Sequence, residues 1–279
     1  MRKDLAQAIL GMYEAIQRAA DEQSKQGHKD QGRRSGITSG KHLDPLVRII
    51  KNDLIDRDFN PDEIFDTGRQ CVLPGWFRPA KNWDLLAFDC GELIAAVELK
   101  SIGSSFGNNA NNRAEESIGS AVDTLEAFRS ELLGSCKIPP VMGYVMIVRD
   151  CPESRNRGKT VYSPHFPIDP MFGNVSFLER FRLLCERLRK ANLYNAVWFV
   201  VADPVSGTVV EPDEAMTYEV FRENLVSGLR IHRAARKGGG PSTLREIRNR
   251  KPRAKRVLRN DDPPGFLDGT SLKRFAQEP

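Results

Sequence analysis

The chain has 279 residues, of which 40% are hydrophobic, so it can bury a sizeable core in one large domain or two small ones. Its longest apolar run, Ala196 to Ala202, is too short for a membrane helix, and no signal-peptide pattern opens the chain, which predicts a cytoplasmic protein without a membrane partner. Five cysteines without a Cys-x-x-Cys pair argue against a disulfide framework or a zinc ribbon. The net charge of +5 is unevenly spread along the chain, so by itself it is not evidence that the folded body binds nucleic acid.

Two amphipathic helices are predicted in the N-terminal part of the chain. Residues 3–22 carry an apolar stripe at helical spacing, from Leu5 to Ile16. Asp44-Pro45 is typical of an N-cap followed by proline in the first turn, which predicts a second helix from Pro45 to about Asp56. Residues 23–40 between them are rich in Gly, Ser, Lys and Gln, which predicts an exposed loop.

A β-hairpin is predicted at residues 83–101, after a short strand around Cys71-Val72-Leu73. Two apolar runs, residues 85–88 and 93–97, flank the turn-forming sequence Asp89-Cys90-Gly91, which is typical of two antiparallel strands. Asp84 then opens the first strand and Glu98 closes the second. Because side chains alternate along a strand, Glu98 and Lys100 lie on one face of the hairpin and Leu99 points into the core.

Two carboxylates and an ammonium group on one face suit phosphodiester hydrolysis. Asp84 and Glu98 offer the oxygen ligands that Mg²⁺ prefers. Lys100 could orient the attacking water, help to deprotonate it or stabilise charge on the phosphate. The three residues match the PD-(D/E)xK nuclease pattern, except that Trp83 stands in place of the proline. A surface ion pair at a strand end is the alternative, and the hairpin context favours the catalytic interpretation.

Residues 101–113 predict a DNA-contacting loop beside this site, because they are rich in Gly, Ser and Asn and offer little to bury. Asparagine and arginine side chains can bind base edges bidentately or contact phosphate. Asparagine also simply favours turns, but the position next to Lys100 favours DNA contacts. The candidate DNA-binding residues are Ser105, Asn108, Asn109, Asn111, Asn112 and Arg113.

The rest of the body alternates between helices and buried strands, which indicates an α/β fold with a mixed central sheet flanked by helices. Glu115 and Glu116 fall in the first turn of one of these helices, where the helix dipole favours acids. They are expected to be solvated or to cap the helix, with contact of one of them with the metal as the alternative. His165 and His232 lack metal-ligand spacing and receive no role. The predicted elements are helices at residues 113–132, from Ser176 onwards and at about 213–232, and strands at 141–148 and 195–202.

The C-terminal segment differs in composition from the rest of the chain. Residues 233–279 contain 13 Lys and Arg against 5 Asp and Glu, a net charge of +8, so residues 1–232 carry −3. Gly238-Gly239-Gly240-Pro241 interrupts the chain, and few apolar residues follow. We therefore expect a disordered basic tail, which is either solvated or adds non-specific phosphate contacts.

Several strings in this sequence resemble the XhoI-type restriction endonucleases. They are Trp83-Asp84, Glu98-Leu99-Lys100-Ser101, Ser105-Phe106-Gly107-Asn108-Asn109 and Asn111-Asn112-Arg113-Ala114-Glu115-Glu116. The resemblance implies a type II site-specific endonuclease with a PD-(D/E)xK core in residues 1–232, Asp84, Glu98 and Lys100 in the metal and catalytic positions, and Mg²⁺ as cofactor. It also implies cleavage of double-stranded DNA at the palindrome CTCGAG with 5′ overhangs and 5′-phosphate ends, and a cognate DNA methyltransferase as genetic partner.

A palindromic site presents the same half-site twice, so a homodimer is the simplest reader. Two alternatives stay open at this point. One is a DNA repair or recombination nuclease on the same core, and the other is a catalytically inactive DNA-binding protein. The inactive protein would be expected to have lost one of Asp84, Glu98 and Lys100, and all three are present.

Overall fold

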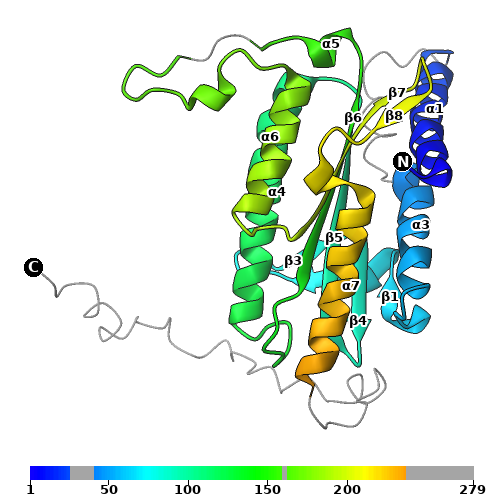
Figure 1. Ribbon diagram of the computed structural model, residues 1–279, viewed down its shortest axis with the longest axis vertical. Coiled ribbons are helices and arrows are strands. Elements are labelled where there is room, and N and C mark those ends of the chain that lie inside the picture. Colours follow the sequence, from blue (N-terminus) through cyan, green and yellow to red (C-terminus); the bar gives the residue numbers. More distant parts are fainter. Residues whose placement is uncertain (26–40, 159–161, 237–279) are drawn as a thin grey trace, which may run out of the picture. The chain divides into compact units, whose positions relative to one another are not determined.

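A six-stranded mixed sheet forms the centre of the computed structural model, which describes residues 1–25, 41–158 and 162–236 (Figure 1). The two parallel pairs are β5 with β6 and β6 with β7, and the other neighbours are antiparallel. In spatial order the strands are β1 (Ile64–Phe65), β4 (Leu85–Asp89), β5 (Glu92–Ile102), β6 (Val141–Arg149), β7 (Ala196–Asp203) and β8 (Thr208–Val210). A separate two-stranded sheet pairs β2 (Val72–Pro74) with β3 (Ala80–Asn82). The predicted α/β class with a mixed sheet is confirmed.

Helices cover both faces of the sheet. One face packs against α1 (Lys3–Lys25), α3 (Asp44–Ile55) and α7 (Tyr218–Ala235), and the other packs against α4 (Phe106–Arg129) and α6 (Phe177–Lys190). The remaining short helices are α5 (Pro152–Arg155), η1 (Lys41–Leu43), η2 (Pro61–Glu63), η3 (Gly68–Cys71), η4 (Pro170–Phe172) and η5 (Glu214–Met216). None of the helices within the described residues is long and apolar enough to cross a membrane.

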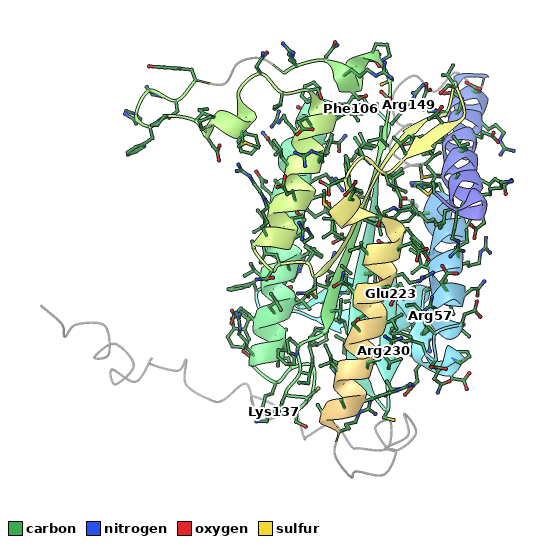
Figure 2. All side chains as sticks on the ribbon, viewed as in Figure 1. Arg57, Phe106, Lys137, Arg149, Glu223 and Arg230 are labelled. Carbon is green, nitrogen blue, oxygen red and sulfur yellow. The ribbon has the colours of Figure 1, made fainter. Side chains whose placement is uncertain are left out.

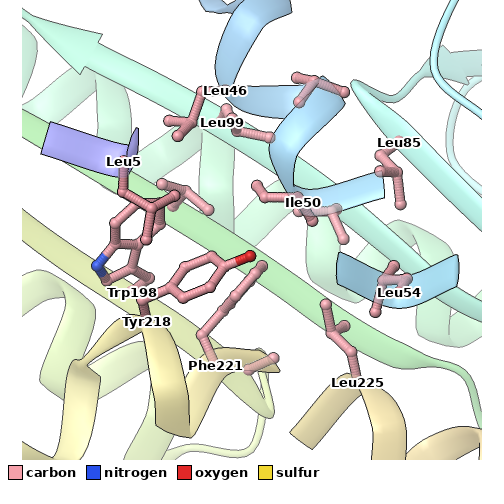
Figure 3. Close-up of a cluster of buried hydrophobic side chains, with 14 of the residues drawn as sticks. Leu5, Leu46, Ile50, Leu54, Leu85, Leu99, Trp198, Tyr218, Phe221 and Leu225 are labelled. Carbon is pink, nitrogen blue, oxygen red and sulfur yellow. The ribbon is translucent and has the colours of Figure 1, made fainter. Parts of the chain in front are cut away.

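Two hydrophobic clusters, one on each face, fix which way each strand residue points. Leu99 of β5 lies 3% exposed in the first cluster, together with Trp198 of β7 and Phe221 of α7 (Figure 3). Because strand side chains alternate, Glu98 and Lys100 point to the opposite face, beneath α4 and α6. Each large apolar side chain buried in this way contributes about 1.5–3 kcal/mol of transfer free energy, so the register that orients Glu98 is strongly specified.

The predicted N-terminal helices and the strands β2, β6 and β7 are confirmed within a few residues. The expected N-cap at Asp44 is wrong, because α3 is preceded by Leu43, which makes no side-chain cap, and Asp44 is already helical. Ser176 does cap α6, accepting a hydrogen bond from the amide of Glu179 at 3.2 Å. Of the expected loop at 23–40, residues 26–40 lie outside the described residues.

The last helix begins later than the sequence indicates. Asp213 caps η5 instead, and α7 starts at Tyr218 behind the cap Thr217. It continues to Ala235, past the expected boundary at residue 232. Almost all of the expected tail, residues 237–279, lies outside the described residues, so the division into an endonuclease domain and a basic tail stays a prediction.

Gly228 lets α7 approach β6 closely. A Cβ atom at this position would lie 2.4 Å from Cγ2 of Val141, whose β-branched side chain has little rotamer freedom. We expect Gly228→Ala to lower the free energy of unfolding by about 1–3 kcal/mol, although alanine is the better helix former. Urea denaturation measures this change. Gly11→Ala in α1 is the matched control, because a Cβ there meets nothing within 4 Å and should stabilise the helix. An unchanged or higher stability of Gly228→Ala would contradict the close packing.

Candidate active site

The predicted hairpin is present, and its turn is tight. Asp89 pairs with Glu92, so only Cys90 and Gly91 form the turn, with φ angles of 52° and 76°. Two consecutive positive φ angles are typical of a type I′ turn, whose twist matches that of the flanking strands. Asp89 belongs to β4 rather than to the turn. The register then sets Leu85 opposite Val97, which brings Asp84 next to the end of β5 that carries the other two candidate residues.

Asp84 is fixed to β5 at two points. Its backbone amide donates to the carbonyl of Val97 at 3.1 Å, and its Oδ2 accepts from the backbone amide of Leu99 at 2.7 Å. Leu99 lies between Glu98 and Lys100 in sequence, so this second bond sets the Asp84 carboxylate beside both side chains. The structure thus brings the three predicted residues together at the junction of β4 and β5.

Glu98 is nearly inaccessible, with 2% of its surface exposed, and its two oxygens have different surroundings. Oε1 accepts from Nζ of Lys100 at 2.7 Å and from Nζ of Lys81 at 3.0 Å. Oε2 is buried and has no hydrogen-bond partner among the described residues. A buried carboxylate oxygen without a partner is costly. Together with the Asp84 carboxylate it provides the oxygen donors that a hard cation such as Mg²⁺ requires.

Burial raises the pKa of Asp84, and the Leu99 amide and the charge of Lys100 oppose this only in part. A raised pKa means that the carboxylate keeps its proton to a higher pH than usual. A cation bound by Asp84 would have to displace this proton.

Glu116 of α4 lies beside this site, through contacts with Lys100 and Arg113 that the sequence did not predict. Its Oε1 lies 2.8 Å from Nζ of Lys100, and its Oε2 lies 2.8 Å from a guanidinium nitrogen of Arg113. Burial lowers the pKa of Lys100, but the attraction of Glu98 and Glu116 outweighs it, so that the pKa is raised. The amine therefore stays protonated. Helical spacing of Arg113 and Glu116 is the signal that could have placed them on one face.

The expected loop at residues 101–113 is wrong. Strand β5 extends to Ile102, and α4 already begins at Phe106, the residue labelled at the N-terminal end of α4 in Figure 2. Phe106 and Ala110, one helical turn apart, are buried, and the Phe106 ring stacks on Phe177 of α6 at 6.5 Å. This tertiary packing overrides the weak helix propensity of glycine and asparagine. The candidate DNA-binding residues therefore lie on a helix and its cap.

Three of these residues are held by contacts within the protein. Asn109 donates its amide to the carbonyl of Ser104 at 2.9 Å, and Asn111 accepts from Arg180 of α6 at 2.9 Å. Arg113 is paired with Glu116. Contacts within the protein therefore fix the positions of these three side chains in the absence of DNA.

The other three candidate residues face solvent. Asn108 and Asn112 are exposed and one turn apart, so they lie on one face of α4. Ser105 is the exposed N-cap of the helix, with a φ of 52° and no side-chain cap. Residues at a helix N-terminus meet unpaired backbone amides, which favour phosphate.

A hollow of about 370 Å³ lies next to Glu116. Its outer wall is the loop that joins β2 to β3, which Asp123 of α4 holds by accepting from the amides of Trp76 and Phe77 at 2.8 and 2.7 Å. Trp76 and Phe77 are 52% and 71% exposed. The lining residues are Phe77, Arg78, Glu115, Glu116, Gly119, Ser120, Val122 and Asp123. Of the candidate-site residues, Glu116 lines this hollow, and the exposed side chain of Phe77 borders it.

Comparison with known proteins identifies the family of this chain. The family model described as restriction endonuclease XhoI matches residues 22–211, a range that contains Asp84, Glu98, Lys100 and Glu116. The chain belongs to the XhoI restriction endonuclease family. No solved structure matches it.

Named relatives agree with this assignment. The chain is 43% identical over 190 residues to the type II restriction enzyme XhoI of Xanthomonas vasicola, a match covering 67% of this chain and 73% of the relative. It is 40% identical over 185 residues to the type II restriction enzyme BstVI of Geobacillus stearothermophilus, covering 64% and 81% of the two chains. It is 37% identical over 161 residues to AbrI of Azospirillum brasilense, covering 57% and 71%. The predicted class, a type II restriction endonuclease, is confirmed.

Proposed function

We propose that this restriction endonuclease uses Mg²⁺ to cleave double-stranded DNA at the palindrome CTCGAG, leaving 5′ overhangs with 5′-phosphate ends. In this proposal it works in the cytoplasm, in a restriction–modification system with a cognate DNA methyltransferase. The observation that carries the proposal is the convergence of Asp84, Glu98 and Lys100 at the junction of β4 and β5, where Oε2 of Glu98 has no hydrogen-bond partner in the part of the chain that the structure describes.

Each residue of the site has a distinct role in this mechanism. Asp84 and Glu98 would hold Mg²⁺, and the Leu99 amide keeps the Asp84 carboxylate in place. Bound Mg²⁺ supplies a Lewis acid and a water of lowered pKa. Lys100 is held as an ammonium group between Glu98 and Glu116, so it donates hydrogen bonds to the attacking water or to phosphate oxygens rather than taking up a proton. Positioning and charge stabilisation supply most of the catalysis in phosphoryl transfer.

DNA binding is assigned to the start of α4 and its cap, residues 105–113. The exposed Asn108 and Asn112 are placed to contact base edges, and Ser105 to contact phosphate at the helix N-terminus. Asn109, Asn111 and Arg113 hold this segment against neighbouring parts of the protein. When DNA binds, Asn109 and Arg113 would give up these protein contacts and contact the DNA instead.

Homodimerisation follows from the symmetry of the proposed target. A palindrome presents two identical half-sites related by a two-fold axis, and each strand must be cut once. In a homodimer, each chain would place its own Asp84, Glu98 and Lys100, together with its own α4, on one half-site.

Digestion of a plasmid of known sequence tests the proposal. With Mg²⁺ the enzyme should give discrete fragments, and sequencing of their ends should show cuts at CTCGAG with 5′ overhangs. Discrete fragments cut at another sequence would refute the target but not the activity. Random degradation would favour a repair nuclease, and binding without any cleavage would indicate an inactive DNA-binding protein.

Asn112→Ala tests the recognition face of α4. We expect it to lose about 1–3 kcal/mol of discrimination at one base pair in both half-sites, because an exposed asparagine can bind an adenine edge bidentately. Cleavage rates on cognate and singly substituted sites measure the change. Asn224→Ala, which changes a half-buried asparagine on α7 at the other face of the sheet, is the control and should leave discrimination unchanged. Equal losses on cognate and non-cognate DNA would reduce Asn112 to a phosphate contact.

A further inference from the structure

A second group of metal-ligating side chains lies at the opposite end of the hairpin from Glu98. Glu92 begins β5, Cys136 lies in the connection from α4 to β6, and His232 lies in the last turn of α7. One ligand atom from each of the three lies within 4.8 Å of the other two. Figure 1 shows the end of α7 at the end of the molecule that carries the β4–β5 turn, and Figure 2 labels Lys137, the neighbour of Cys136, there.

The geometry indicates a single common centre. Sγ of Cys136 lies 3.6 Å from Nδ1 of His232, and Oε2 of Glu92 lies 3.7 Å from the same nitrogen. A catalytic thiol–imidazole–carboxylate relay uses both ring nitrogens, one for each partner. Here both partners approach one nitrogen. In a tetrahedral zinc site the ligand bond lengths imply about 3.6 Å between sulfur and nitrogen and about 3.4 Å between nitrogen and oxygen.

The donor types select the metal. A thiolate and an imidazole favour Zn²⁺, whereas Mg²⁺ prefers oxygen ligands alone. Glu92 also lies in an ion pair, since Nε of Arg236 is 3.2 Å from its Oε2, and Arg236 is in turn paired with Asp89 at the end of β4.

We propose that Glu92, Cys136 and His232 bind one Zn²⁺ ion, with water as the fourth ligand. Cys136 releases its thiol proton to solvent when it binds the metal. The ion ties the end of α7 to the hairpin and to the α4–β6 connection. Six residues of extended strand, about 20 Å, separate Glu92 from Glu98. This site is therefore distinct from the catalytic one, and His232 lies beyond the matched family range of 22–211.

Cobalt substitution tests the site in the full, untagged chain after removal of metals with a chelator. Co²⁺ should give a thiolate-to-cobalt charge-transfer absorption that saturates at one equivalent per chain, and Zn²⁺ should abolish it. Saturating Zn²⁺ should also raise the midpoint of thermal unfolding by about 5 °C or more. Co²⁺ bound only by Asp84 and Glu98 gives no thiolate absorption, so the result does not depend on the proposed catalytic mechanism.

Matched cysteine variants identify the ligand. Cys136→Ser should lose both the absorption and the Zn²⁺-dependent rise in melting temperature, whereas Cys151→Ser, a half-buried free thiol outside the group, should keep both. Glu92→Gln keeps the thiol and should show the absorption at weaker Co²⁺ affinity, by about 10-fold or more. An absence of the absorption in the folded wild-type chain would overturn the proposal, as would its persistence in Cys136→Ser.

Discussion

Glu98→Gln should lower the rate of DNA cleavage by about 1,000-fold or more, which corresponds to about 4 kcal/mol of transition-state stabilisation. The amide keeps the size of the side chain but removes the charge that would hold Mg²⁺. Asp84→Asn should have a similar effect, since its amide oxygen can still accept the Leu99 hydrogen bond and preserve the local structure. Single-turnover cleavage of a duplex that contains the cognate site measures both rates.

DNA binding separates loss of chemistry from loss of the fold. Base and phosphate contacts are assigned to α4, so both variants should still shift a cognate duplex in a binding assay without metal. Glu115→Gln provides the matched control, because Glu115 is an exposed neighbour of Glu116 and undergoes the same change of charge. Wild-type cleavage by either Glu98→Gln or Asp84→Asn would remove that residue from the proposed metal site.

Lys100→Arg should lower cleavage by about 100-fold although it keeps the positive charge. Nζ of Lys100 lies 2.7 Å from Glu98 and 2.8 Å from Glu116. A planar guanidinium cannot occupy the same position between two carboxylates, and its donors point in fixed directions. The rate of cleavage at saturating enzyme measures the effect, with DNA affinity expected to change little.

Glu116→Gln gives an independent measure of the same arrangement. It keeps Lys100 and loses only one of the two charges that hold the ammonium group, so its loss should be smaller, about 10-fold. A near-normal rate in Lys100→Arg would mean that the lysine acts only as a fixed positive charge. If Glu115→Gln lowered the rate of cleavage as much as Glu116→Gln does, the negative charge on α4 would determine the rate, and not the contact of Glu116 with Lys100.

The hairpin and its three chemical groups were predictable because the signals are local. The two apolar runs at residues 85–88 and 93–97 and the turn-forming sequence between them predict the two strands, and the two-residue period then predicts that Glu98 and Lys100 share a face. The turn length sets the pairing of Asp89 with Glu92, but a register shift between Ala87 and Phe88, which the sequence did not indicate, is what brings Leu85 opposite Val97. Nothing beyond residues 84–100 enters this part of the prediction, so neighbouring elements could not overturn it.

The start of α4 and the contacts of Glu116 depend on residues that are distant in sequence. Phe106 forms a helix because Phe177, more than 70 residues later, provides a surface to bury it. Glu116 reaches Lys100 only because α4 then crosses the face of β5. Lys81 likewise meets Glu98 through the separate β2–β3 sheet. No local pattern contains these contacts, which is why the sequence indicated a loop and did not predict how Glu116 and Lys81 contact Lys100 and Glu98.

The two hydrogen bonds that fix Asp84 to β5 have a consequence for the timing of catalysis. Both use backbone groups of the strand that also carries Glu98 and Lys100, so the orientation of this carboxylate is settled when the hairpin folds. The Asp84 carboxylate is therefore already immobilised before DNA binds. The conformational entropy that the side chain loses is lost on folding, so this loss does not add to the activation barrier of cleavage. Conversely, a substitution that weakens the pairing of β4 with β5 should slow cleavage even where it touches no group of the site.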